Sequence, residues 1–255
     1  MKPVDEMHLR EVELWLEFVS RGVEAADDPA EAAHVIRKRG WFCVAEFEPA
    51  DYLRVSDVLL EHDANAGFAF LGRDADDLAD TIAELDARGH EIVFHGHRHH
   101  AFGDLSYDRA REYLSTGLDC IEDATGVAPS GLFTPMSETS EGTLRALSDL
   151  GLEWVLGSTD AEAVPDDISV LAPEKPYDDH FFEGGDSPTE VFDRFRRRAT
   201  EESTFVFHPP YHRHYDATDA FERWVADVSP VSVSERLDSG GVGLVLDCAR
   251  PIRAT

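Results

Sequence analysis

The chain of 255 residues is poor in basic residues, and in lysine above all. It has 23 basic residues, only three of them lysine, against 52 acidic ones, which gives a formal net charge of −29. The acids are spread through every expected helix rather than gathered in a tail. This distribution indicates a solvated acidic surface and not a disordered acidic arm. So negative a surface excludes nucleic acid and anionic membranes as good partners.

An acidic surface of this kind repels itself, and salt relieves the repulsion. At molar ionic strength the Debye length falls to about 3 Å, so that neighbouring like charges hardly interact. The composition therefore predicts a protein from the cytosol of an extreme halophile, which loses its fold on dialysis into low salt.

Cysteine pairs and long apolar runs are also lacking. Cys43, Cys120 and Cys248 are far apart and odd in number, which predicts neither a disulfide framework nor a CxxC site. Residues 1–21 carry five acids among their apolar residues and so do not resemble a signal peptide. No other segment is apolar for long enough to cross a bilayer. We expect a cytoplasmic protein that does not insert into membranes.

Short apolar runs alternate with amphipathic stretches from residue 41 onward. The expected strands are residues 41–47, 67–71, 91–94, 131–133, 153–156, 168–171, 204–207 and 242–246. The expected helices between them are residues 52–62, 76–85, 107–125, 141–150, 189–198 and 221–228, with a long loop at 173–188. This alternation predicts an α/β fold with about seven parallel strands, closed into a barrel rather than left as an open sheet. Residues 1–40 read as an N-terminal helical extension, which leaves residues 41–255 for the barrel domain.

Histidines cluster at the end of one expected strand. Five of the twelve histidines lie between His90 and His100, and four of them follow the apolar run at 91–94. His95 and His99 are four residues apart, so a turn that starts at His95 would direct both at one ion. If the strand continued, His95, His97 and His99 would share a face instead. Neutral imidazole suits zinc, cobalt, nickel or iron. The alternative is a chance cluster of solvated histidines.

Two other strand ends carry reactive side chains. Glu46 and Glu48 close the first expected strand, and His208 follows the strand at 204–207. Because the carboxyl ends of parallel strands open on one face of a barrel, these groups could converge with the histidines. Glu48, His95 and His99 would then hold a metal and leave positions open for water and substrate. Glu46, on the same face as Glu48, could serve as a base, and His208 as a general acid or as a turn residue.

The histidine segment resembles a known motif. Arg-Gly-His-Glu-Ile at residues 88–92, followed by His95 and His99, is similar to the second motif of the polysaccharide deacetylase (NodB-homology) family. Residues 105–112, 124–135 and 207–209 resemble later segments of that family in the same order. The resemblance extends from about residue 41 to residue 237.

Membership of this family implies a distorted (β/α) barrel with a divalent metal, zinc in many members. It also implies hydrolysis of N-acetyl, or sometimes O-acetyl, groups on sugars. Carried over by position, the metal ligands are Glu48, His95 and His99, the general base is Glu46 and the general acid is His208. The residues expected to contact substrate are Phe133, Pro135, Tyr211 and His212. The expected substrate is a small or carrier-linked acetylated sugar.

Two departures from the family pattern leave alternatives open. The family usually has aspartates where this chain has Glu46 and Glu48, and Phe133 or Thr134 stands where it has an arginine. A base displaced by about 1 Å can cost roughly 100-fold in rate. A catalytically impaired protein that binds metal or sugar is therefore one alternative. Hydrolysis of a non-sugar linear or cyclic amide is another, and an acidic α/β domain with incidental histidines is the third.

Overall fold

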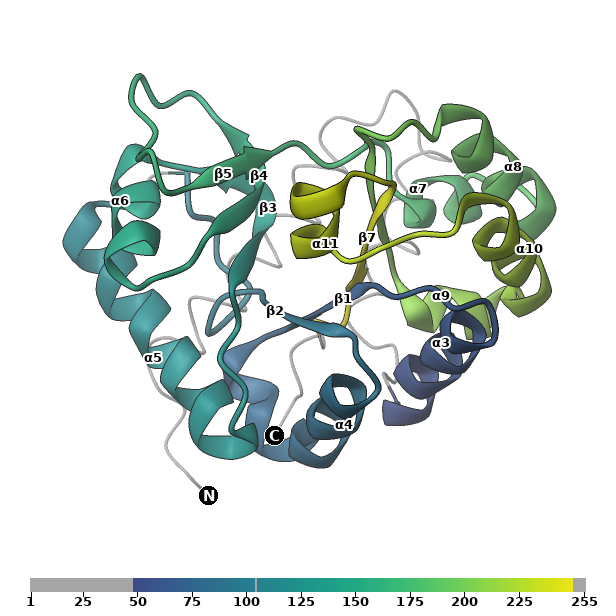
Figure 1. Ribbon diagram of the computed structural model, residues 1–255, viewed down its shortest axis with the longest axis horizontal. Helices are drawn as coiled ribbons and strands as arrows, with labels where there is room; N and C mark the ends of the chain where they lie inside the picture. The colour runs from purple at the N-terminus through teal and green to yellow at the C-terminus, as the bar shows by residue number, and fades with distance from the viewer. Residues whose placement is uncertain (1–47, 104, 250–255) are drawn as a thin grey trace, which may run out of the picture. The chain divides into compact units, whose positions relative to one another are not determined.

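The computed structural model describes residues 48–103 and 105–249 (Figure 1). Within these residues the chain forms seven parallel strands in the order β5-β4-β3-β2-β1-β7-β6. The sheet curls into a half-barrel with helices outside it, which confirms the predicted distorted barrel. The expected helical extension at residues 1–40, the strand at 41–47 and the boundary between them lie outside the described residues.

The strands agree closely with the apolar runs of the sequence. Their bounds are β1 Gly67–Phe70, β2 Glu91–Phe94, β3 Gly131–Thr139, β4 Trp154–Thr159, β5 Ser169–Leu171, β6 Thr204–Phe207 and β7 Gly243–Asp247. Only β3 is much longer than expected, because a register shift between Phe133 and Glu138 lets it continue past Pro135. The C-terminal strand β7 pairs with both β1 and β6 and so lies inside the sheet.

The helices form a continuous outer layer. Their bounds are α3 Pro49–Glu61, η1 Gly72–Asp74, α4 Ala75–Ala87, α5 Tyr107–Thr125, α6 Glu141–Asp149, α7 Asp178–Glu183, α8 Pro188–Arg198, α9 Pro209–His214, α10 Thr218–Val228 and α11 Val233–Ser239. Neighbouring helices of this layer pack on each other in the order α6, α5, α4, α3, α10, α8 and α7 (Figure 1). None of the helices in the described residues is long and apolar enough to span a membrane.

Side chains alternate between the two faces of each strand, because the side-chain period of a strand is two. Ala69, Val93, Val206 and Val245 point to the inside of the half-barrel and form one core cluster. The aromatic residues between them point outward. Phe207, for example, meets Phe195 and Trp224 of the helical layer. This alternation decides which residues at the strand ends face the interior.

Helix α11 lies across the amino-terminal end of the half-barrel, near the centre of Figure 1. Its Ser234 donates two hydrogen bonds to the Glu91 carboxylate, one from the backbone N–H and one from the hydroxyl. The indole N–H of Trp154 and the hydroxyl of Ser130 also donate to that carboxylate. The amino-terminal end of the sheet is therefore closed by a polar cluster, and the carboxyl-terminal end is left for a site.

Three helices differ from the sequence expectation. The predicted loop at residues 173–188 was wrong in part, because it contains α7. Helices α9 and α11 were not expected either. Each of these helices has only six or seven residues, so each offers too few turns for an apolar periodicity to show. Helix α7 positions a residue of the candidate site, described next.

Candidate metal centre

Three reactive side chains face the interior at the carboxyl ends of neighbouring strands. His95, Asp247 and His208 stand two residues after Val93, Val245 and Val206, which all point inward. The alternation therefore brings these three side chains to one place. All three are buried, with exposed fractions of 0% for His95, 5% for Asp247 and 6% for His208.

His95 is oriented by the strand next to it. Its Nδ1 lies 2.7 Å from the backbone carbonyl oxygen of Phe133 and donates a hydrogen bond to it. The ring of Phe133 stacks on the imidazole at 4.6 Å between centroids. The Nδ1 proton leaves the lone pair on Nε2, which lies 3.7 Å from Asp247 Oδ2 and makes no hydrogen bond. Metal-binding histidines are commonly fixed by a carbonyl in this way.

His99 completes a group of three potential ligands. One donor atom from each of His95, His99 and Asp247 lies within 4.8 Å of the other two. The rings of His95 and His99 are 5.1 Å apart, edge to face. Two imidazoles and one carboxylate fit zinc, cobalt or another divalent ion, and three protein ligands leave a coordination position open. The buried Nε2 of His95, which has no hydrogen bond, supports this fit.

The protonation states also suit metal binding. Burial lowers the pKa of His95, and burial together with the neighbouring His95 lowers the pKa of His99 to about 3. Both imidazoles are therefore neutral at physiological pH, as metal ligands must be. Burial raises the pKa of Asp247, but the positive charge that His95, His208 and His99 carry when protonated outweighs burial and holds that pKa below its usual range. Asp247 is therefore an anion.

His208 lies beside this group and is held by Asp178 of α7. Its Nδ1 donates to Asp178 Oδ1 at 2.6 Å, and its backbone N–H donates to Oδ2 at 2.9 Å. Its Nε2 lies 3.6 Å from Asp247 Oδ2. Burial lowers the pKa of His208, but the Asp178 carboxylate outweighs burial and raises it to about 10. His208 is therefore a protonated imidazole whose Nε2–H faces the metal group.

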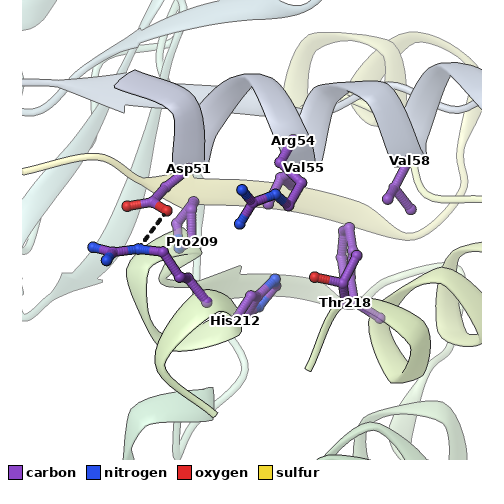
Figure 2. Close-up of a pocket in the computed structure, with 9 residues that line it drawn as sticks. Asp51, Arg54, Val55, Val58, Pro209, His212 and Thr218 are labelled. Carbon is purple, nitrogen blue, oxygen red and sulfur yellow. Dashed lines mark hydrogen bonds and ion pairs between the residues drawn. The ribbon is translucent and has the colours of Figure 1, made fainter. Parts of the chain in front are cut away.

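Glu48 lies at the start of helix α3. Glu48 is exposed at the N-cap of α3, where it forms a capping box with Asp51. Its Oε1 lies 3.6 Å from Arg213 Nη1, and Arg213 Nε donates to Asp51 Oδ1 at 2.8 Å, the dashed contact in Figure 2. Glu48 is not in the group that contains His95 and His99. Glu46 lies outside the described residues.

The four residues expected to contact substrate are all buried. Phe133 supports His95, and Pro135 follows it on β3. Tyr211 is 1% exposed, and its hydroxyl donates to Glu183 at 2.5 Å. The Nε2 of His212 lies 3.5 Å from Asp178 Oδ2. His212 also lines the small cavity between α3, α9 and α10 that Figure 2 shows.

Two residues of the site were missed in the sequence, Asp247 and Asp178. Asp247 directly follows an apolar run, as His95 and His208 do, and that shared position is the signal that could have found it. Asp178 lies in the segment that the sequence predicts as a loop, and no local pattern marks it. Its place depends on α7, which packs beside β6.

Comparisons with known proteins bear on this geometry. A family model for polysaccharide deacetylase matches residues 40–155. No curated protein sequence matches the chain. Solved structures do match, and at identities of 20% or less they show the fold. One of them is a CE4 family pseudoenzyme from Bacillus anthracis, with a TM-score of 0.56 and 16% identity. The match covers 79% of this chain and 60% of that one.

Two further structures cover more of their own length. A protein of Mycobacterium smegmatis assigned to the polysaccharide deacetylases has a TM-score of 0.61 and 20% identity, covering 83% of this chain and 81% of that chain. A family 4 acetyl xylan esterase from Clostridium thermocellum, in complex with a cobalt ion, has a TM-score of 0.52 and 16% identity, covering 78% and 82%. The family model covers less than half of the chain, and the resemblance to polysaccharide deacetylases that the sequence indicated is confirmed.

Proposed function

We propose that this protein is a metal-dependent hydrolase that removes an N-acetyl or similar acyl group from a soluble carbohydrate. The observation that supports this most is the group of His95, His99 and Asp247, with His208 beside it. We propose zinc as the metal and these three side chains as its ligands, so that Asp247 takes the place predicted for Glu48.

A metal bound here would polarise the acyl carbonyl and lower the pKa of a water molecule toward neutrality. His95 and His99 bind as neutral imidazoles, and the Phe133 carbonyl keeps Nε2 of His95 directed at the site. His208 holds a proton on Nε2 and gives it to the departing amine, while Asp178 orients the ring and stabilises its charge. Glu46 remains the proposed general base, because it stands at the end of the first expected strand.

A second candidate is a protein that binds metal or sugar without turnover. Among residues 48–103 and 105–249, Asp247 is the only carboxylate grouped with His95 and His99. One carboxylate cannot act both as a metal ligand and as a free base on the same water. This candidate is therefore correct if no residue outside the described ranges supplies the base.

Acetate release from N-acetylglucosamine oligomers separates the two candidates. The protein is stripped with a chelator, reloaded with Zn²⁺ in molar KCl, and assayed with His95→Ala as the control. The hydrolase predicts release that depends on zinc and is absent from His95→Ala. Zinc bound without any acetate released would overturn the hydrolase and leave the binding protein.

A further inference from the structure

The loop that carries His99 is contacted by η1 and by α5 and has no strand beside it. Strand β2 ends at Phe94, and residues 96–100 have no strand neighbour. The backbone N–H groups of Gly72 and Arg73 donate to the carbonyls of Gly96 and His97 and so fix the first half of the loop. In the second half, the backbone N–H of His100 donates a hydrogen bond of 2.8 Å to the carbonyl of Arg98.

Tyr113 of α5 contacts the same carbonyl from outside the loop. Its hydroxyl donates a hydrogen bond of 2.9 Å to the backbone carbonyl of Arg98. That carbonyl belongs to the same planar peptide unit as the backbone N–H of His99, so the hydrogen bond restrains the orientation of the whole unit. The Tyr113 ring also meets His97 at 6.1 Å and His100 at 5.3 Å, edge to face. Tyr113 therefore contacts the loop on both sides of His99.

The close approach of α5 to the loop depends on glycine. A Cβ on Gly117, one turn after Tyr113, would lie 2.9 Å from the Cα of His97 and 2.6 Å from the Phe94 ring. A Cβ on Gly72 would lie 2.6 Å from the Cα of Gly117. The two glycines let η1, α5 and the loop meet at backbone distance, which brings Tyr113 within reach of Arg98.

We infer that Tyr113 is a positioning residue for the metal centre, which holds the His99 imidazole in binding geometry through the Arg98 carbonyl. The inference rests on the metal site proposed above. Since His95 is fixed separately by Phe133, loss of the Tyr113 hydroxyl affects one ligand of the three. A loosened ligand binds less tightly, because the chain must then order the loop on binding.

The test is Tyr113→Phe, which keeps the ring and removes only the hydroxyl. Tyr107→Phe is the matched control, because Tyr107 is also half-buried on α5 and its hydroxyl also donates, to Asp149 at 2.5 Å, away from the loop. Co²⁺ is titrated into the metal-free wild type and both variants, and the visible absorption of the bound cobalt is recorded with the thermal melting curve of each protein. Outer groups that orient metal ligands typically contribute 10- to 100-fold to affinity, so we expect Tyr113→Phe to weaken Co²⁺ binding about tenfold and to alter the cobalt spectrum.

Tyr107→Phe is expected to bind Co²⁺ as the wild type does, whatever its melting temperature. Equal cobalt affinity and spectra in wild type and Tyr113→Phe would overturn the inference and leave the metal site standing. An equal loss of affinity in both variants would also overturn it, because a general loss of α5 stability would then explain the effect. A wild-type protein that binds no Co²⁺ would overturn the metal site itself, and this inference with it.

Discussion

Asp178 and His208 form a buried pair in which both oxygens of the carboxylate accept hydrogen bonds from the same residue, at 2.6 Å from the ring and 2.9 Å from the backbone. The two residues are 30 positions apart and lie on α7 and directly after β6. The pair fixes both the tautomer and the rotamer of the imidazole. His208 is therefore prepared to donate from Nε2 before any substrate arrives.

Asp178→Asn should reduce catalysis without removing the metal. General acid catalysis typically contributes 10²- to 10⁴-fold, so we expect kcat for acetate release to fall by about 100-fold or more. The matched control is Asp179→Asn, which removes the neighbouring charge but no hydrogen bond to His208. A similar kcat in the two variants would show that charge, and not orientation by Asp178, governs His208.

The polar cluster at the other end of the half-barrel should contribute to stability alone. Ser234→Ala removes a hydroxyl that donates to Glu91 at 2.5 Å and accepts from Trp154 at 3.1 Å. Hydrogen bonds to charged groups contribute roughly 1.5–3 kcal/mol, so the free energy of unfolding should fall by about 2 kcal/mol. Ser239→Ala on the same helix, where the exposed hydroxyl meets only the Glu235 carbonyl, is the control. The free energy of unfolding is measured in urea. An equal decrease in Ser234→Ala and Ser239→Ala would contradict the role assigned to this cluster.

His90 should make stability depend on pH. Burial, followed by the charge of Arg88, lowers the pKa of His90 to about 4. Arg88 donates to Ser56 Oγ, and Ser56 lies 2.9 Å from His90 Nε2, so its hydroxyl can donate to the neutral ring. Because the folded pKa lies below the unfolded value, the contribution is complete above about pH 6.5 and is lost as the pH falls from 6.5 toward 4. The loss has a limiting slope of about 1.4 kcal/mol per pH unit.

Unfolding free energies measured across this range in molar KCl provide the check. His90→Gln should show a shallower slope than the wild type between pH 6.5 and pH 4, although it is less stable at pH 7. Parallel slopes for the two proteins would mean that His90 does not remain neutral in the folded chain.

The net charge of −29 predicts that stability rises with salt. Between 0.1 M and 1 M salt the Debye length falls from about 10 Å to about 3 Å, which screens repulsion between acidic side chains. Melting temperatures should therefore be clearly higher in molar KCl than in dilute buffer. Potassium chloride is the appropriate salt, because sulfate stabilises folded proteins by exclusion from their surface. Equal melting temperatures in both conditions would remove the argument for a halophilic setting.

Much of the fold could be predicted because its strands are short apolar runs with clear ends. Residues 204–207 are strand β6 and residues 107–125 are helix α5, both as the sequence indicated. The short helices could not be predicted, since α7 has six residues and buries a single apolar side chain, Phe182, which is too little for an apolar periodicity to show.

The site could be predicted in part, for a related reason. His95 and His208 follow buried strands whose direction the sequence shows. Their meeting with Asp247 depends on strand order, because β7 pairs with both β1 and β6, and strand order cannot be read from local pattern. In the same way, the contact of Tyr113 with Arg98 requires α5 to pack on the loop. Local patterns thus identify candidate ligands, and tertiary packing selects among them.

The central claim is that Asp247, and not Glu48, supplies the carboxylate of the metal centre. It is tested most directly by metal content after dialysis against Zn²⁺ in molar KCl, for the wild type, Asp247→Asn and Glu48→Gln, each confirmed as folded by circular dichroism. We predict one zinc ion per chain in the wild type and in Glu48→Gln, and a strongly reduced content in Asp247→Asn. Zinc kept by Asp247→Asn and lost from Glu48→Gln would contradict the account.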